Sequence, residues 1–243
     1  ALDASFVDPD KKYFITSYRA RGLYLSKDRV DPSTLSGYMD LIQPKWKGKI
    51  AIRSGYHDYN ISLFCQMAES EGIDAVRTFI TGLHKNLARA PKGNDRAQVQ
   101  AIYEKEADIS IGNSYYMGIM MGRDDQRPWA LATTFFFPDQ NGKGSYVMRA
   151  AAGLTKAERC VPEATKLLEY FTSDFVQYYL TSVLHVYSIK DTLPVSTFNQ
   201  TLGTGQKDVK EGRFKANFVS LRDIDKHREA VVKILNEVNF DQK

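Results

Sequence analysis

Two short segments of the chain carry tyrosines whose hydroxyl groups could together bind a hard metal ion. Tyr115 and Tyr116 form a pair directly after a short apolar run, and Tyr56 and Tyr59 lie three residues apart in an earlier polar segment. A phenolate is a hard anionic oxygen ligand, and a highly charged cation lowers the pKa of a phenol from its usual value of about 10. Ligand hardness therefore favours Fe(III) over zinc or copper for converging tyrosines. Half-buried aromatic side chains near helix starts explain the same residues, and composition alone favours that explanation.

Polar residues at expected helix starts could bind an anion. They are Ser54-Gly55, Asn94 and Asn113. Exposed backbone N–H groups and the helix dipole make such positions favourable for carbonate, phosphate or a carboxylate. Taken singly, Asn94 and Asn113 are more simply explained as helix caps.

Signals for an enzyme or a structural metal are weaker. Ser54, His57, Asp58 and Cys65 are close in sequence, so a hydrolase can be imagined, but no GxSxG, HExxH or glycine-rich phosphate loop accompanies them. The two cysteines, Cys65 and Cys160, form no CxxC and have no zinc-ligand spacing. We therefore expect both to be small buried hydrophobic residues rather than metal ligands or a disulfide.

The composition is that of an ordinary folded protein of 243 residues. Hydrophobic residues make up 43% and charged residues 26%, which excludes a disordered chain, and the length suits one large domain or two small ones. The net charge of +4 is mild and its basic residues are scattered, so no nucleic-acid surface is expected. No apolar run approaches the ~20 residues of a membrane span. The first residues show no targeting signal, and a signal removed on export would leave no trace.

Short apolar runs alternate with helical patterns along the chain, and this predicts an α/β fold with mostly parallel strands. In such sheets ligands bind beyond the carboxyl ends of strands, and the segments 54–60 and 113–116 occupy strand-to-helix positions of this kind. A capping box at Ser220 and Asp223 is expected to start the final helix. The expected strands are 13–25, 50–52, 108–112, 133–137 and 146–154. The expected helices are 31–41, 61–72, 74–83, 95–107, 117–121, 156–184 and the final helix after 220.

Three runs of sequence resemble, in their order and spacing, the ferric-iron-binding proteins of bacterial ABC importers. The runs are Trp46–Ile50 followed by Arg53–Leu63, then Gly93–Val99, then Ala107–Gly118. The resemblance covers most of the chain, and the tyrosine pair after a strand is its most specific element. The run Tyr59-Asn60-x-Ser62-Leu63 is similar to the subgroup that uses an extra tyrosine.

The resemblance implies a periplasmic-binding-protein fold of the second type, with two lobes, mostly parallel central strands and a ligand cleft between the lobes. Tyr59, Tyr115 and Tyr116 would coordinate Fe(III), and a synergistic anion such as carbonate or phosphate could share the site. The protein would be a periplasmic monomer without turnover that delivers iron to an inner-membrane ABC permease. A metal-free protein of the same fold that binds an anion or small carboxylate is the alternative. The positions implied for an anion or for supporting contacts are Ser54, Gly55, Asn94, Asn113, Arg19 and Arg21.

The resemblance also implies how the chain is divided. Members of the family begin with a further segment whose first strand supplies a His and a Tyr to the metal, and we expect that segment to be missing here. Lobe closure would be a hinge motion across 23–27 and 133–137. The expected parts are the end of the leading N-lobe segment with the hinge (1–25), a C-lobe carrying the tyrosines (26–132), a return to the N-lobe (133–195), and a C-terminal connector and helix packing on the lobes (196–243).

Overall fold

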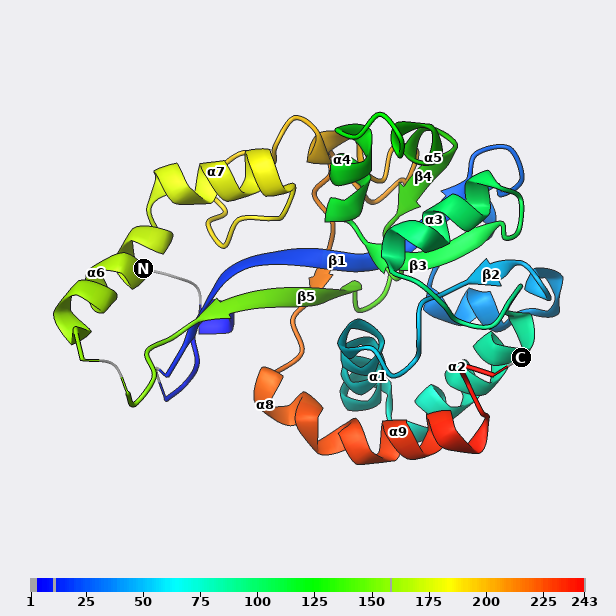
Figure 1. Ribbon diagram of the computed structural model, residues 1–243, viewed down its shortest axis with the longest axis horizontal. Helices are drawn as coiled ribbons and strands as arrows, with labels where there is room; N and C mark the ends of the chain where they lie inside the picture. Colours follow the sequence, from blue (N-terminus) through cyan, green and yellow to red (C-terminus); the bar gives the residue numbers. More distant parts are fainter. Residues whose placement is uncertain (1–3, 11, 158, 243) are drawn as a thin grey trace.

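The long strand β1 is central to the sheet, because three of the other strands pair with it directly. The computed structural model describes residues 4–10, 12–157 and 159–242. The first half of β1 pairs with β5, and its second half pairs with β3 and β4. Figure 1 shows β1 running from the α6 side of the molecule to the α3 side. The strands are β1 (Phe14–Ser26), β2 (Ile50–Ala51), β3 (Ile109–Asn113), β4 (Thr133–Phe136), β5 (Ser145–Ala152) and β6 (Ala216–Asn217).

The prediction of mostly parallel strands is wrong for the described residues. All three pairings of β1 are antiparallel, and only β2 with β3 and β5 with β6 are parallel. The prediction assumed that a helical crossover joins successive strands. Helices do connect β2 to β3, but no helix lies between β4 and β5, which pair one after the other with the second and first halves of β1 and both run opposite to it. The mixed α/β class itself is confirmed.

The main apolar core is formed by α1, α2 and α9, which pack on one another, together with buried residues of β1, β2 and β3 (Figure 1). At its centre, the ring of Phe64 contacts those of Phe79 and Phe240, with both centroid separations at 6.2 Å. The α-helices are α1 (Asp58–Glu71), α2 (Ile73–Asn86), α3 (Asp95–Tyr103), α4 (Tyr115–Met121), α5 (Arg127–Leu131), α6 (Val161–Phe171), α7 (Asp174–Leu184), α8 (Leu221–Ile224) and α9 (Arg228–Glu237). Short 3₁₀ segments are Ala4–Phe6, Pro32–Thr34, Tyr38–Ile42, Pro44–Trp46, Asn199–Thr201 and Asp225–His227.

Three local predictions are wrong. The expected helix over 31–41 is two 3₁₀ segments, because Leu35 and Gly37 adopt extended backbone between them. Ser220 makes no side-chain capping hydrogen bond, and a 3₁₀ turn separates α8 from α9. Cys65 is buried as expected, but Cys160 is exposed.

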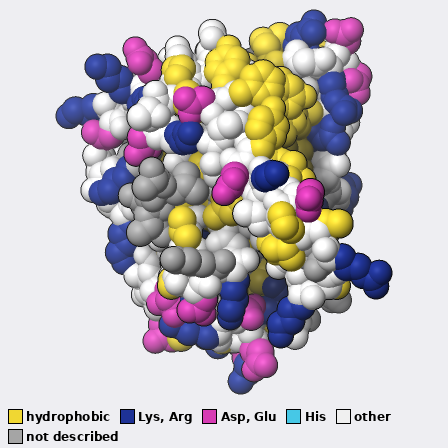
Figure 2. Space-filling model, turned by 90° about the vertical axis from the view of Figure 1, so that its left-hand side faces the viewer, with side chains coloured by type: hydrophobic (Ala, Val, Ile, Leu, Met, Phe, Trp, Pro, Cys, Tyr) yellow, Lys and Arg dark blue, Asp and Glu magenta, His cyan; other side chains and the backbone are white. Residues whose placement is uncertain are grey.

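Helices α6 and α7 present an apolar face to solvent, which we call the α6–α7 face. Helix α6 contains no buried residue. Figure 2 shows a large group of hydrophobic side chains on this side of the molecule. Exposed patches of this kind on a soluble protein bind apolar probes and partners. The face is formed by Val161, Leu167, Tyr170, Phe175, Tyr178, Tyr179, Val183 and Leu184.

The chain is expected to bind the apolar dye ANS through the α6–α7 face. Replacing Phe175 and Tyr178, which are 69% and 58% exposed, with serine should lower the dye fluorescence by about half or more. Stability should change by only about 0.5 kcal/mol, since neither side chain is packed. Leu131→Ser, at a 53% exposed leucine on α5, is the matched control and should leave the fluorescence unchanged. Equal fluorescence in all variants would contradict an accessible apolar face.

In the part of the chain that the structure describes, no helix has the length and apolar character needed to cross a lipid bilayer.

Candidate functional site

The candidate site forms where two parallel strands end side by side. Strand β2 leads through a short loop into α1, and β3 leads almost directly into α4. Parallel strands end at the same edge of a sheet, so the first turns of α1 and α4 become neighbours. This confirms the strand-to-helix positions expected for 54–60 and 113–116. Helix α1 begins earlier than expected, at Asp58, because His57 Nδ1 accepts a hydrogen bond from the Tyr59 N–H and caps the helix.

Three tyrosines from these two helix starts meet at this edge. The ring centroids of Tyr115 and Tyr116 are 4.1 Å apart. The hydroxyl of Tyr59 lies near enough to those of Tyr115 and Tyr116 for the pKa of each phenol to depend on the other two. The guanidinium of Arg19 lies 5.7 Å from the Tyr59 ring centroid and 5.8 Å from that of Tyr115. The structure therefore brings together the three side chains that the iron hypothesis requires.

The three phenols differ in how readily they ionise. Burial raises the pKa of Tyr59, but hydrogen bonding to Tyr115 and the positive charge of Arg19 outweigh it, so the pKa is lowered below 10. Burial and hydrogen bonding to Tyr116 and Tyr59 raise the pKa of Tyr115. Burial is also the main cause that raises the pKa of Tyr116. Tyr59 is thus the first phenolate of the cluster, and its charge holds the protons on its neighbours.

Arginines surround the cluster. Besides Arg19, the guanidinium groups of Arg21 and Arg53 lie 5.6 Å and 5.2 Å from the Tyr59 ring centroid. Arg96 lies 6.0 Å from that of Tyr116. Positive charge at this range favours ionised phenols and attracts anions.

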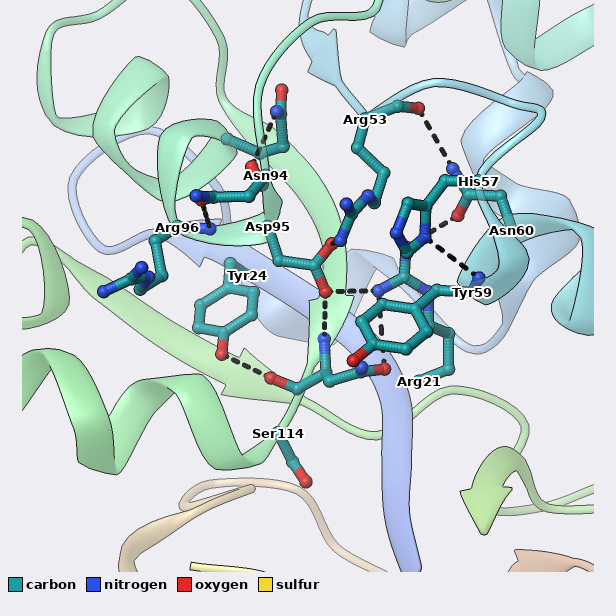
Figure 3. Close-up of polar contacts among 12 residues, drawn as sticks. Arg21, Tyr24, Arg53, His57, Tyr59, Asn60, Asn94, Asp95, Arg96 and Ser114 are labelled. Atoms are coloured by element: carbon teal, nitrogen blue, oxygen red, sulfur yellow. Dashed lines mark hydrogen bonds and ion pairs between the residues drawn. The ribbon is translucent and has the colours of Figure 1, made fainter. Parts of the chain in front are cut away.

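A buried hydrogen-bond network, drawn in Figure 3, lies next to Tyr59. Arg21 is fully buried, and it donates to Asp95 Oδ2 at 2.5 Å and to Asn60 Oδ1 at 2.6 Å. Arg53 donates to Asp95 Oδ1 at 3.2 Å. Asn113 is also buried, and its backbone N–H donates to Asp95 Oδ2 at 3.0 Å. Arg21 and Asn113 therefore belong to this network, and Arg21 also faces the Tyr59 ring.

The network includes residues that the sequence analysis did not select. Arg53, Asn60 and Asp95 lie within the quoted runs of sequence but received no role. An acidic residue after an Asn cap is ordinary at a helix start, because it complements the helix dipole. A signal that could have found Asp95 is that its helix start precedes a short strand ending beside the tyrosine pair.

The other anion positions have partners within the chain. Ser54 Oγ bonds Asp241 Oδ2 at 2.5 Å, and the Gly55 N–H donates to Asp241 Oδ1 at 2.8 Å. These donors therefore already bond a carboxylate near the C-terminal end, and they are not part of the candidate site. Asn94 Oδ1 accepts from the backbone N–H groups of Arg96 and Ala97, which is the simple capping role.

The residues that suggested a hydrolase do not form a nucleophile–base pair with one another. Ser54 bonds Asp241, and His57 Nδ1 caps α1. Asp58 pairs with Arg228. Cys65 is buried in α1, where desolvation raises its thiol pKa to about 11. None of these side chains is held as an activated nucleophile or its base.

Within residues 4–10, 12–157 and 159–242, no group of three or more His, Cys, Asp or Glu side chains could hold a metal ion. A metal bound by this part of the chain would therefore need other donors. Phenol oxygens are such donors, and they suit a hard trivalent cation.

Comparison with known proteins identifies the family. The family described as "Bacterial extracellular solute-binding protein" matches residues 1–199. Iron uptake protein A1 of Synechocystis sp. is 32% identical over 234 residues, which are 96% of this chain and 62% of that protein. Iron uptake protein A2 of the same organism is 30% identical over 236 residues, 96% of this chain and 66% of that protein. The chain thus spans less than two thirds of the length of these curated relatives.

Solved structures give the same fold. Mannheimia haemolytica ferric iron-binding protein A, in an open conformation, is 37% identical with a TM-score of 0.89, covering 100% of this chain and 74% of that one. A Trichodesmium protein in complex with iron and citrate ligands is 32% identical with a TM-score of 0.89, covering 98% and 73%. The mixed α/β fold is that of the type II periplasmic binding proteins. The chain belongs to the bacterial extracellular solute-binding protein family, a family of binding proteins rather than enzymes.

Proposed function

We propose that the chain captures Fe(III) through the phenolates of Tyr59, Tyr115 and Tyr116. The observation that carries this proposal is that Tyr59 of α1 lies beside Tyr115 and Tyr116 of α4, with the guanidinium of Arg19 over the rings of Tyr59 and Tyr115. Three phenolates offset the three charges of Fe(III), and the described residues contain no group of three or more His, Cys, Asp or Glu side chains that could hold the metal instead. The names of the relatives, which are iron uptake and ferric-ion-binding proteins, support the same cargo.

We propose that an anion such as carbonate or phosphate shares the site at Arg19. The guanidinium of Arg19 lies over the rings of both Tyr59 and Tyr115. Its buried Nε has no hydrogen-bond partner among the described residues. A buried guanidinium donor is strongly favoured to bond an anionic oxygen. The Trichodesmium protein was solved with citrate as well as iron, which supports a companion anion here.

A metal-free anion-binding protein is the second candidate, because four guanidinium groups lie near three tyrosine rings. Calorimetry with citrate or phosphate separates the two functions. The iron proposal expects little heat from these anions after iron is removed with a chelator, and strong binding when ferric citrate is added. Equal heat with and without iron would favour the metal-free candidate.

We propose that β1 is the hinge strand of a two-lobe binding protein that serves an ABC permease in the periplasm. Leu23 to Ser26 of β1 pair with Thr133 to Phe136 of β4, which places the two expected hinge segments side by side. Residues 26–132 would form the tyrosine-carrying lobe, 1–25 and 133–195 the second lobe, and 196–243 a connector ending in α9. The description of the family as extracellular solute-binding proteins supports this location and partner.

Iron affinity is expected to fall as the pH falls. Each phenol must lose a proton to bind, so acid competes with the metal at every ligand that is protonated in the metal-free protein. The pKa values of Tyr115 and Tyr116 are raised, so at least these two protons are released at neutral pH, and the apparent affinity should drop on the order of 100-fold per pH unit. Competition with nitrilotriacetate at pH 8, 7 and 6, corrected for protonation of the chelator, measures the slope. A flat profile would contradict phenolate ligation.

A further inference from the structure

Asp95 joins three segments of the chain behind the tyrosine cluster. It is the first residue of α3, and it is completely buried. Its carboxylate accepts hydrogen bonds from Arg21 Nη1 at 2.5 Å, Arg53 Nη1 at 3.2 Å and the Asn113 N–H at 3.0 Å. These donors belong to β1, to the loop before α1 and to the end of β3. One carboxylate therefore holds the strand that carries Arg19 and the two segments that lead into the tyrosines.

The two arginines bonded to Asp95 form the support for the Tyr59 ring. Their guanidinium carbons lie 5.6 Å (Arg21) and 5.2 Å (Arg53) from its centroid. Asn60 completes the link, since its Oδ1 accepts from Arg21 at 2.6 Å and its Nδ2 donates to the backbone oxygen of Arg53 at 3.0 Å. Figure 3 shows Arg21 next to the Tyr59 ring, with Arg53 above the ring and Asp95 to its left in this view. The position of the Tyr59 ring thus depends on two positively charged guanidinium groups, which stay close together because the Asp95 carboxylate lies between them.

An amide cannot replace the Asp95 carboxylate in this arrangement. All three of its partners are donors, so the NH₂ group of an asparagine would face a guanidinium or a backbone N–H. The side chains of Arg21 and Asp95 are both 0% exposed and that of Arg53 is 12% exposed, so water does not screen the repulsion that would remain. Removing one member of a buried charge network leaves the others uncompensated.

We propose that Asp95 is a positioning residue for metal capture: through Arg21 and Arg53 it fixes the Tyr59 ring so that the Tyr59 hydroxyl meets those of Tyr115 and Tyr116. Asp95 itself contacts no metal. The inference rests on the proposed function, because it assigns Asp95 a role through Tyr59.

A double-mutant cycle with ferric nitrilotriacetate as the probe tests the coupling. Asp95→Asn is expected to weaken iron binding about 10-fold or more, as loss of an outer partner of a metal ligand does. The visible absorbance per bound iron should fall to the value of Tyr59→Phe. In the Tyr59→Phe background, Asp95→Asn should weaken binding several-fold less than in the wild-type chain, since the ligand that Asp95 positions is already lost and only its bond to the Asn113 N–H still bears on Tyr115 and Tyr116. Asp95→Glu, which keeps the charge, should recover part of the absorbance.

A matched control removes a carboxylate pair elsewhere. Asp108→Asn breaks the pair of Asp108 with Arg29 at the opposite end of β3, and it should leave both the absorbance and the affinity unchanged. Equal weakening by Asp95→Asn in both backgrounds, or none in the wild-type chain, would overturn the positioning role. If near-UV circular dichroism shows that Asp95→Asn is unfolded, Arg53→Gln takes its place in the same double-mutant cycle, because Arg53 lies at the outer edge of the network. No visible band in the wild-type chain would instead refute the proposed function and the role of Asp95 with it.

Discussion

Replacing both Tyr115 and Tyr116 with phenylalanine is expected to remove most of the visible band of the ferric protein. The substitution removes two of the three phenolates and keeps both rings, whose centroids are 4.1 Å apart. Iron affinity should fall by more than the roughly 10–100-fold that the loss of an outer partner costs, because ligands to the metal are lost directly. Absorbance titration with ferric nitrilotriacetate measures both effects, and thermal melting shows whether the chain stays folded.

The chain contains a matched control for this experiment. Tyr178 and Tyr179 are also adjacent in sequence, and they lie 58% and 52% exposed on α7. Changing both to phenylalanine removes the same atoms from a site that has no role in the proposed centre. The control should keep the full band and affinity. A band of normal intensity in the Tyr115→Phe, Tyr116→Phe variant would show that the colour and the binding arise elsewhere.

Phe240→Ala is expected to produce the largest loss of stability. Phe240 is fully buried near the C-terminal end, and its ring packs on Phe64 of α1. It also lies against Gly55, where a Cβ atom would come within 2.5 Å of the Phe240 ring. Truncation of a buried phenylalanine costs about 3–5 kcal/mol, which corresponds to a drop in Tm on the order of 10 °C for a chain of this size.

The same variant should also weaken iron binding, because the loop at Gly55 leads into the helix that carries Tyr59. Phe175→Ala, at a phenylalanine 69% exposed on α7, is the matched control and should change the Tm by about 1 °C or less. Thermal melting followed by circular dichroism measures both variants. Equal Tm values for Phe240→Ala and the wild-type chain would contradict the packing of the C-terminal end on α1.

The sequence was sufficient to predict the strands and most helices around the site. Apolar runs such as 109–113 are short and bounded by polar residues, so their periodicity and length mark them as buried strands. Tyr59 and the 115–116 pair follow two such runs, and the parallel pairing of β2 with β3 brings them together. Strand direction was not predictable in the same way, since the alternation of residues in β1 is the same whether its neighbours are parallel or antiparallel.

Local sequence patterns could not predict the contacts between segments that are distant in the chain. Ser54 and Gly55 look like an anion site, but Asp241, almost 190 residues later, supplies the carboxylate they bond. Asp95 looks like an ordinary helix-start acid, and only the fold shows that it bonds Arg21 and Arg53 in the interior. Charged residues are rarely buried, so a sequence gives little warning of a network of this kind.

Anomalous diffraction at the iron edge, from crystals of the chain soaked in ferric nitrilotriacetate, tests iron capture by the tyrosine cluster most directly. The account predicts one strong peak within coordination distance of the hydroxyl oxygens of Tyr59, Tyr115 and Tyr116. A peak held only by other residues, or none at this edge of the sheet at saturating iron, would contradict it.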